Sequence, residues 1–135
     1  MKKAIQRILL LMTAVVLCMS LTGCGEYTSS YSATVLITSN TSKKMSVEFS
    51  SLKGKMVHKL KCDGKEGREL KYTASLKSGT ATVYYDIDGT REELFTIHGG
   101  ETADSSLGNL AKGKIYIIIE TEGKCEGGSF KLNIE

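Results

Sequence analysis

The sequence holds two histidines, His58 and His98, the residue type that most often transfers protons in active sites. It contains no Gly-x-Ser-x-Gly or His-Glu-x-x-His motif, and neither histidine has a serine, cysteine or carboxylate near it in a recognisable nucleophile arrangement. We therefore expect His58 to be a partly buried strand residue and His98 to be a loop residue. No catalytic residue and no cofactor is predicted.

The N-terminal segment has the composition of an export signal. A short basic lead, residues 1–7, precedes an apolar run, residues 8–21, that only Thr13 and Ser20 interrupt. The run is shorter than the roughly 20 residues that cross a bilayer, which argues against a retained membrane helix. The segment is therefore expected to be removed on export.

Leu21-Thr22-Gly23-Cys24 closes the apolar run and resembles the lipobox of bacterial lipoproteins. The resemblance implies cleavage after Gly23 and a diacylglyceryl thioether on Cys24. Two or three acyl chains, as this class implies, anchor a protein stably. The expected location is the bacterial cell membrane, with the chain lipid-anchored and facing outside the cytoplasm. An ordinary signal peptide with a chance cysteine is the alternative.

Cys62 and Cys125 are the cysteines that remain beyond Cys24. An even pair in an exported chain predicts a disulfide between them. Both stand beside turn residues at expected strand ends, where two Cα atoms can approach closely enough for a bridge. Two unrelated free thiols are the alternative. No metal site is predicted, because neither cysteine has a second Cys or a His at ligand spacing.

Removal of 23 of the 135 residues leaves 112, enough for one hydrophobic core. Lys2, Lys3 and Arg7 are three of the 18 basic residues, so 15 remain against 15 acidic ones. A mature chain with no formal charge has no bulk attraction to nucleic acid, and that partner is excluded. We expect residues 24–32 to be the lipidated cysteine and a flexible tether, and residues 33–135 to be one domain.

From residue 33 onward the apolar residues recur with a period of two, which predicts strands and no helix. Turn residues follow at intervals of about ten residues, and proline is absent. Asp88-Gly89 favours a two-residue type I′ turn in a hairpin from Thr80 to Ile97. A loop is expected from residue 98 to 113, followed by a central strand that holds Ile117. The predicted fold is all-β: an antiparallel β-sandwich of two sheets and about eight strands.

The predicted inward residues alternate along each expected strand. They are Val35 and Ile37; Met45, Val47 and Phe49; Met56, His58, Leu60 and Cys62; Leu70, Tyr72, Ala74 and Leu76; Ala81, Val83, Tyr85 and Ile87; Phe95 and Ile97; and Phe130, Leu132 and Ile134.

Residues 113–120 and 127–134 are expected to form a closing hairpin around the turn that holds Cys125. This pair of segments resembles the closing hairpin of bacterial extracellular jelly-roll and Ig-like modules. The resemblance implies a fold class and no activity.

Tyr84 and Tyr116 fall on outward phases and are candidates for stacking on a sugar. Lys59 and Lys61 are candidates for contact with an anionic wall polymer or lipid headgroups. Cross-strand packing of the tyrosines and a solvated sheet edge are the alternatives. The two lysines belong to a basic cluster of Lys53, Lys55, Lys59, Lys61, Lys65, Arg68 and Lys71.

Asp86-Ile87-Asp88-Gly89 resembles the start of a calcium loop, but the remaining ligands are absent at the required spacing. The turn alone accounts for Asp88-Gly89. No metal is therefore predicted.

Taken together, these patterns predict a lipid-anchored envelope protein that is a non-catalytic binding or structural module. A carbohydrate- or anionic-polymer-binding accessory module is the first alternative, and an envelope hydrolase is a minor one. The expected partners are the membrane, through the lipid anchor, and an envelope polymer or envelope protein.

Overall fold

The computed structural model describes residues 27–135, so the expected signal peptide and Cys24 lie outside the described range. Residues 27–135 contain strands and turns, and no helix in this range is long and apolar enough to cross a membrane. The strands are β1 (Ser30–Thr34), β2 (Ile37–Asn40), β3 (Lys44–Cys62), β4 (Leu70–Asp86), β5 (Arg91–His98), β6 (Thr102–Leu107) and β7 (Gly113–Ile134).

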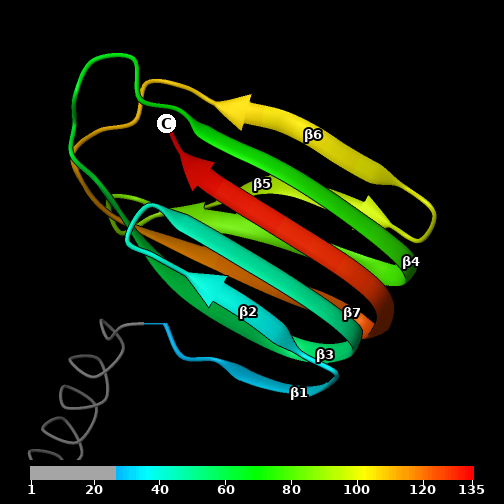
Figure 1. Ribbon diagram of the computed structural model, residues 1–135. Coiled ribbons are helices and arrows are strands. Elements are labelled where there is room, and N and C mark those ends of the chain that lie inside the picture. Colours follow the sequence, from blue (N-terminus) through cyan, green and yellow to red (C-terminus); the bar gives the residue numbers. More distant parts are fainter. Residues whose placement is uncertain (1–26) are drawn as a thin grey trace, which may run out of the picture.

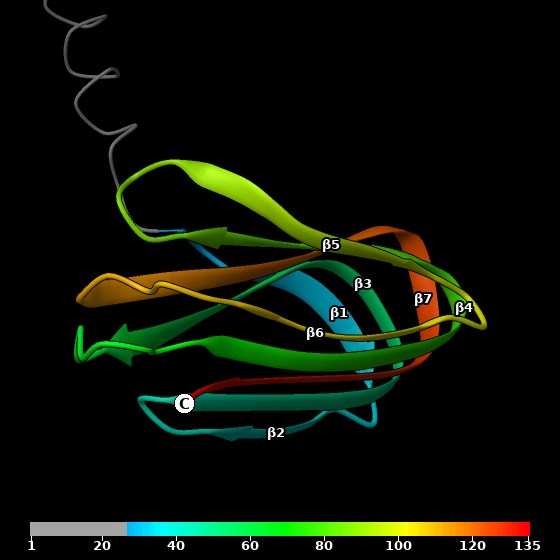
Figure 2. The same ribbon diagram turned by 90° about the horizontal axis from the view of Figure 1, so that it is seen from above.

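Three long strands build the fold: β3, β4 and β7, of 19, 17 and 22 residues. β7 lies between the other two and pairs antiparallel with both. Each long strand bends near its middle, so residues 44–53 of β3 pair with residues 124–133 of β7, and residues 55–62 pair with residues 113–120. The bends lay one half of the sheet over the other, and the two layers are seen in Figure 2.

Shorter strands flank the long ones (Figure 1). What we call the first layer holds residues 44–53, 124–134 and 70–78 of the long strands, with β2 beside β3 and β6 beside β4. The second layer holds residues 55–62, 113–120 and 80–86, with β5 beside β4. β1 pairs with residues 51–55 at the bend of β3. The predicted antiparallel all-β fold with two packed layers is confirmed.

A glycine with positive φ lies at each of the three bends: Gly54 in β3, Gly79 in β4 and Gly123 in β7, with φ of 123°, 99° and 71°. Residues with a Cβ rarely adopt these angles. The pairing register of β7 with both of its neighbours shifts at the same places, as at a β-bulge. Glycine therefore allows each strand to bend without ending.

Alternate side chains of the long strands fill the space between the layers. The rings of Phe49 and Phe130 stack at 6.1 Å between centroids, and those of Tyr72 and Phe95 at 4.8 Å. Of the inward residues predicted between 45 and 83, all but the half-buried His58 are buried. Val35 and Ile37 were wrongly placed inside, since their side chains are 69% and 60% exposed.

The predicted closing hairpin is wrong, because residues 113–134 form one strand, β7. The strand bends at its glycine-rich middle. Cys125 pairs with Leu52 of β3, so the pairing of the two strands continues through this segment. The structure likewise joins the predicted second and third strands into β3, and the fourth and fifth into β4. Seven strands therefore replace the expected eight.

The predicted hairpin of β4 and β5 is present, but its turn is not type I′. Asp86 pairs with Arg91, which leaves residues 87–90 in the connection. Within it Gly89 has a positive φ of 97° and Asp88 does not, whereas a type I′ turn needs both. The side chain of Asp86 closes the turn instead, accepting a hydrogen bond from the Gly89 N–H at 2.7 Å.

Two segments expected to be irregular are strands. β6 lies within the expected loop 98–113, and its run of Thr, Asp and Ser side chains hides the alternation. β1 begins at Ser30, inside the expected tether 24–32, and pairs with the bend of β3. The ordered domain therefore starts before the predicted residue 33.

Cys62 and Cys125 are both buried free thiols, so the predicted disulfide is contradicted. Cys62 ends β3 opposite Gly113, whereas Cys125 lies near the bend opposite Leu52. The residues of β3 that separate these two positions advance about 3.3 Å each, far more in total than a bridge spans. Cys62 therefore lies at one end of the long strand pair and Cys125 near its middle.

Candidate functional site

The outer face of the second layer carries all four residues predicted as a ligand surface. Lys59 and Lys61 lie on β3, Tyr116 on β7 and Tyr84 on β4, each between neighbours that point into the core. Lys59 pairs directly with Tyr116, and Tyr84 pairs with Ile118 on the same strand as Tyr116. The alternation of the sequence correctly placed the four side chains on one face.

Both tyrosine rings on this face already carry a cation. The guanidinium carbon of Arg91 lies 3.9 Å from the centroid of the Tyr84 ring, and the Lys59 ammonium lies 5.6 Å from that of Tyr116. The Tyr27 ring meets Tyr116 edge-on at 5.4 Å. Each ring therefore has a cation–π partner within the chain. Stacking of a sugar on these rings stays a prediction.

Asp86 is buried beneath these rings, with 4% of its surface exposed. Its Oδ2 accepts a hydrogen bond from the Tyr27 hydroxyl at 2.6 Å, and its Oδ1 accepts one from Gly89. The bond to Asp86 is the main cause of the raised pKa of Tyr27, with burial second. Within residues 27–135 no cluster of three or more metal-binding side chains occurs, and both oxygens of Asp86 are occupied.

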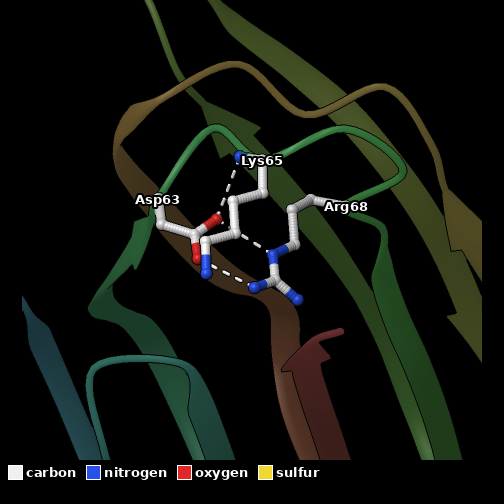
Figure 3. Close-up of polar contacts among 3 residues, drawn as sticks. All are labelled: Asp63, Lys65 and Arg68. Atoms are coloured by element: carbon white, nitrogen blue, oxygen red, sulfur yellow. Dashed lines mark hydrogen bonds and ion pairs between the residues drawn. The ribbon is translucent and has the colours of Figure 1, made fainter.

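The predicted basic cluster is divided among the first layer, the second layer and the loop between β3 and β4. Arg68 and Lys65 lie on the loop between β3 and β4, where Asp63 holds them (Figure 3). The Arg68 Nε and Nη2 donate to the two Asp63 oxygens at 2.9 and 2.8 Å, and the Lys65 N–H donates at 3.0 Å. These bonds, above all those from Arg68, hold the pKa of Asp63 well below its usual range. Lys71 lies on the outer face of the first layer.

That outer face of the first layer is hollowed. Two adjoining hollows of about 540 and 290 Å³ share Thr73, Asp104 and Lys131, so they form one open groove across β6, β4 and β7. The side chains that point into it are polar. They include Lys71, Thr73, Ser75, Thr102, Asp104, Ser106, Ser129, Lys131 and Asn133.

At one end of the groove Lys71 forms an ion pair with Glu135 at 2.7 Å, and Asn133 donates to the same carboxylate at 3.1 Å. Within residues 27–135, neither Lys131 nor Asp104 forms an ion pair. An ammonium donates, a carboxylate accepts and a hydroxyl does both. The groove therefore offers donors and acceptors side by side to a ligand of the same character.

The groove was not predicted from the sequence, because β6 lacks the alternation of a strand and lies in the expected loop 98–113. The signal was present in part, since Lys71, Thr73 and Ser75 fall on outward phases of β4. Only the pairing of Thr73 with both Asp104 and Lys131 brings the three strands together.

The two histidines lie apart from the groove. His98 is exposed at the end of β5, with Nδ1 3.1 Å from the Thr80 hydroxyl. His58 points between the layers, where its Nε2 is buried with no hydrogen-bond partner among the described residues. Burial lowers the pKa of His58. Neither arrangement is that of a catalytic acid or base.

No protein-family model and no curated protein matches the sequence. Among solved structures, the chain is similar to a mutant of a family 29 carbohydrate-binding module, with 16% identity over 78% of each chain and a TM-score of 0.41. It is also similar to TmCBM61 in complex with β-1,4-galactotriose, with 14% identity over 82% of this chain and 71% of that one, and a TM-score of 0.43. Protein NMB1881 from Neisseria meningitidis is 18% identical over 86% and 93%, with a TM-score of 0.35. Values this low assign no function.

Proposed function

We propose that the protein is a non-catalytic module, anchored outside the cytoplasm through a lipid on Cys24, that binds a hydroxyl-rich envelope polymer in the groove of the first layer. The observation that carries this proposal is the open groove itself, whose outward side chains are hydroxyls, lysines and a carboxylate. Such groups exchange hydrogen bonds with sugar hydroxyls in both directions.

The groove favours recognition by hydrogen bonds over stacking. Its one aromatic lining residue, Tyr72, is 9% exposed and stacks on Phe95 inside the core. Hydrogen bonds formed in exchange for water contribute about 1 kcal/mol each, so we expect weak binding that depends on several groups at once. A repeating polymer compensates for such weakness by offering many equivalent sites.

Binding of polymers to the unmodified protein tests this proposal. An array of neutral and acidic envelope polysaccharides identifies the class of ligand, and titration calorimetry measures its affinity. The variant Asp104→Ala with Lys131→Ala should weaken binding about tenfold or more, because it removes two charged hydrogen-bonding groups. The matched control, Glu93→Ala with Lys61→Ala, removes the same charges from the second layer and should bind normally.

Absence of binding to every polymer on the array would contradict the proposal, as would loss of binding in the control variant alone. The chain length of each bound polymer is compared before and after prolonged incubation. Shortened chains would show that the protein is a hydrolase.

Lipidation is tested separately, by mass spectrometry of the protein from the membrane fraction. We expect a mature chain that begins at a diacylated Cys24. A protein released to the medium with a free Cys24 thiol would contradict the anchor and leave the binding proposal standing.

A further inference from the structure

Tyr27, the first described residue, is fixed to the outer face of the second layer. Its hydroxyl donates to the buried Asp86 at 2.6 Å, and its ring meets Tyr116 at 5.4 Å. Two residues later the Ser29 hydroxyl oxygen accepts a hydrogen bond from the Val57 N–H at 2.9 Å. The chain therefore joins the domain on this face, through contacts with β3, β4 and β7.

Only Gly25 and Glu26 separate Tyr27 from Cys24. An extended chain advances at most about 3.5 Å per residue, so the three steps from Cys24 to Tyr27 span about 10 Å. A lipid on Cys24 thus keeps the Tyr27 attachment within about 10 Å of the membrane surface. The groove lies on the outer face of the other layer. Packed sheets lie about 10 Å apart, so the groove is beyond that reach. Figure 2 shows the two layers.

Three lysines lie on the same face as this attachment: Lys55 and Lys61 of β3 and Lys114 of β7, which we call the lysine strip. The Lys55 ammonium lies 6.0 Å from the centroid of the Tyr27 ring. Lys61 and Lys114 stand directly opposite each other in the ladder, a like-charge pair that disfavours the sheet unless an anion lies nearby.

Among residues 27–135, Lys55, Lys61 and Lys114 form no ion pair. Of the carboxylates on the same face, Asp86 accepts hydrogen bonds from Tyr27 and Gly89. Glu120, opposite Lys55, forms an ion pair with Arg91 of β5 at 2.7 Å. The strip therefore presents a local excess of positive charge on the face where the chain enters the domain.

We propose that the lysine strip lies against anionic lipid headgroups, so that the anchored domain is oriented with its groove facing away from the membrane. This inference rests on the lipid anchor proposed above. The anchor holds the strip at a distance from the membrane surface that is comparable with the screening length, about 8 Å at physiological ionic strength. The lysines are therefore attracted electrostatically to anionic headgroups. The proposed binding partner of the strip is therefore an anionic membrane surface.

Lysine acylation footprinting of the membrane-extracted protein tests the orientation. The protein is reconstituted into vesicles of phosphatidylcholine alone or mixed with phosphatidylglycerol, and acylation of each lysine is followed by mass spectrometry. With phosphatidylglycerol, acylation of the strip should slow about fivefold, the factor that corresponds to ~1 kcal/mol per lysine near an anionic surface. Lys44, Lys71 and Lys131 of the first layer are internal controls and should react at the same rate on both kinds of vesicle.

The variant Tyr27→Phe removes the hydrogen bond to Asp86 and loosens the attachment. It should lose most of the protection of the strip while it still floats with vesicles. The matched control Tyr31→Phe removes the same hydroxyl from an exposed β1 side chain and should keep the protection. If the lysines of both layers are equally protected from acylation, the proposal is overturned. It is also overturned if the strip is protected only after an acidic wall polymer is added.

Failure of the lipid anchor is distinguished by a second form of the chain, in which an N-terminal polyhistidine tag replaces residues 1–24 and binds nickel-chelating lipids. If this form shows the footprint, the orientation stands even where lipidation of Cys24 fails. If the tagged form and the lipidated form both lack the footprint, the inference is wrong and the groove proposal is unaffected.

Discussion

His58 is the described ionisable side chain that points into the core without a hydrogen-bond partner for its buried Nε2. Burial lowers its pKa, because protonated imidazole loses its hydration there. The unfolded chain therefore binds a proton at higher pH than the folded one. The free energy of unfolding is at its full value above about pH 6.5 and falls as the pH decreases through the unfolded pKa toward the lower folded one.

We expect His58→Leu to remove most of the loss of stability between about pH 7 and pH 5, because the ionisable group is gone. Urea unfolding at the two pH values measures the effect. The matched control His98→Gln replaces an exposed histidine and should keep the loss. An unchanged pH dependence in His58→Leu would show that another group is responsible.

Cys62 and Cys125 should behave as free thiols in protein isolated under oxidising conditions. Burial raises the pKa of Cys125, and its Sγ donates to the Thr80 carbonyl oxygen at 3.2 Å. The raised pKa lowers the fraction of reactive thiolate at Cys125, and burial shields both thiols. Both should therefore resist alkylation in the folded chain and react fully in denaturant without reductant. Mass spectrometry counts the labels, and a melt with reductant should give the same midpoint. An unlabelled, oxidised pair would contradict the structure.

At the scale of elements, the bends of the long strands depend on glycine. Gly79 has a φ of 99°, and a Cβ there would lie 2.8 Å from the Cys125 Sγ and 2.9 Å from the Cys125 Cα. Gly89 has nearly the same φ, 97°, and a Cβ there would meet nothing within 4 Å. The two positions share the backbone strain and differ in crowding.

We therefore expect Gly79→Ala to lower the free energy of unfolding by about 1–3 kcal/mol more than Gly89→Ala. Urea unfolding of both variants and of the unmodified chain measures the difference. Equal losses would mean that the bend of β4 has room for a methyl group and that only its backbone angle matters.

The sequence predicts a strand correctly where apolar and polar residues alternate along it. It does not predict where a strand bends or ends, because that depends on pairing with strands distant in the sequence. Met45, Val47 and Phe49 alternate with polar residues, and each is buried as expected. Gly79 follows Ser78 in a pattern that fits a turn as well as a bend. Which of the two occurs depends on the distant pairing of β4 with β7, which no local pattern records.

The same limit applies to the site. The phases of Tyr84 and Tyr116 placed them on one face, but the cation over Tyr84 comes from Arg91 through the register of β4 and β5. The groove needs Asp104, whose strand carries too few apolar residues to be recognised. The face of the sheet on which a residue lies was thus predictable, whereas its neighbours on adjacent strands were not.

At the scale of the whole molecule, β3, β4 and β7 each run through both layers, so neither layer has a complete set of strands of its own. The apolar side chains of both layers also share one core. Opening one layer would expose the core face of the other. The two layers should therefore unfold in a single cooperative step.

Val47 of the first layer and Val83 of the second are both fully buried, with 0% exposure. Val47→Ala and Val83→Ala should each lower the free energy of unfolding by about 1–3 kcal/mol, because each leaves a small cavity. In either variant, amide hydrogen exchange in the slowest-exchanging segments of both layers should accelerate by the same factor, since one global opening exposes them all. Ile37→Ala, at a side chain 60% exposed, is the matched control and should change neither layer. If Val83→Ala accelerated exchange only in the second layer, the bends of the three long strands would be hinges between separately stable halves.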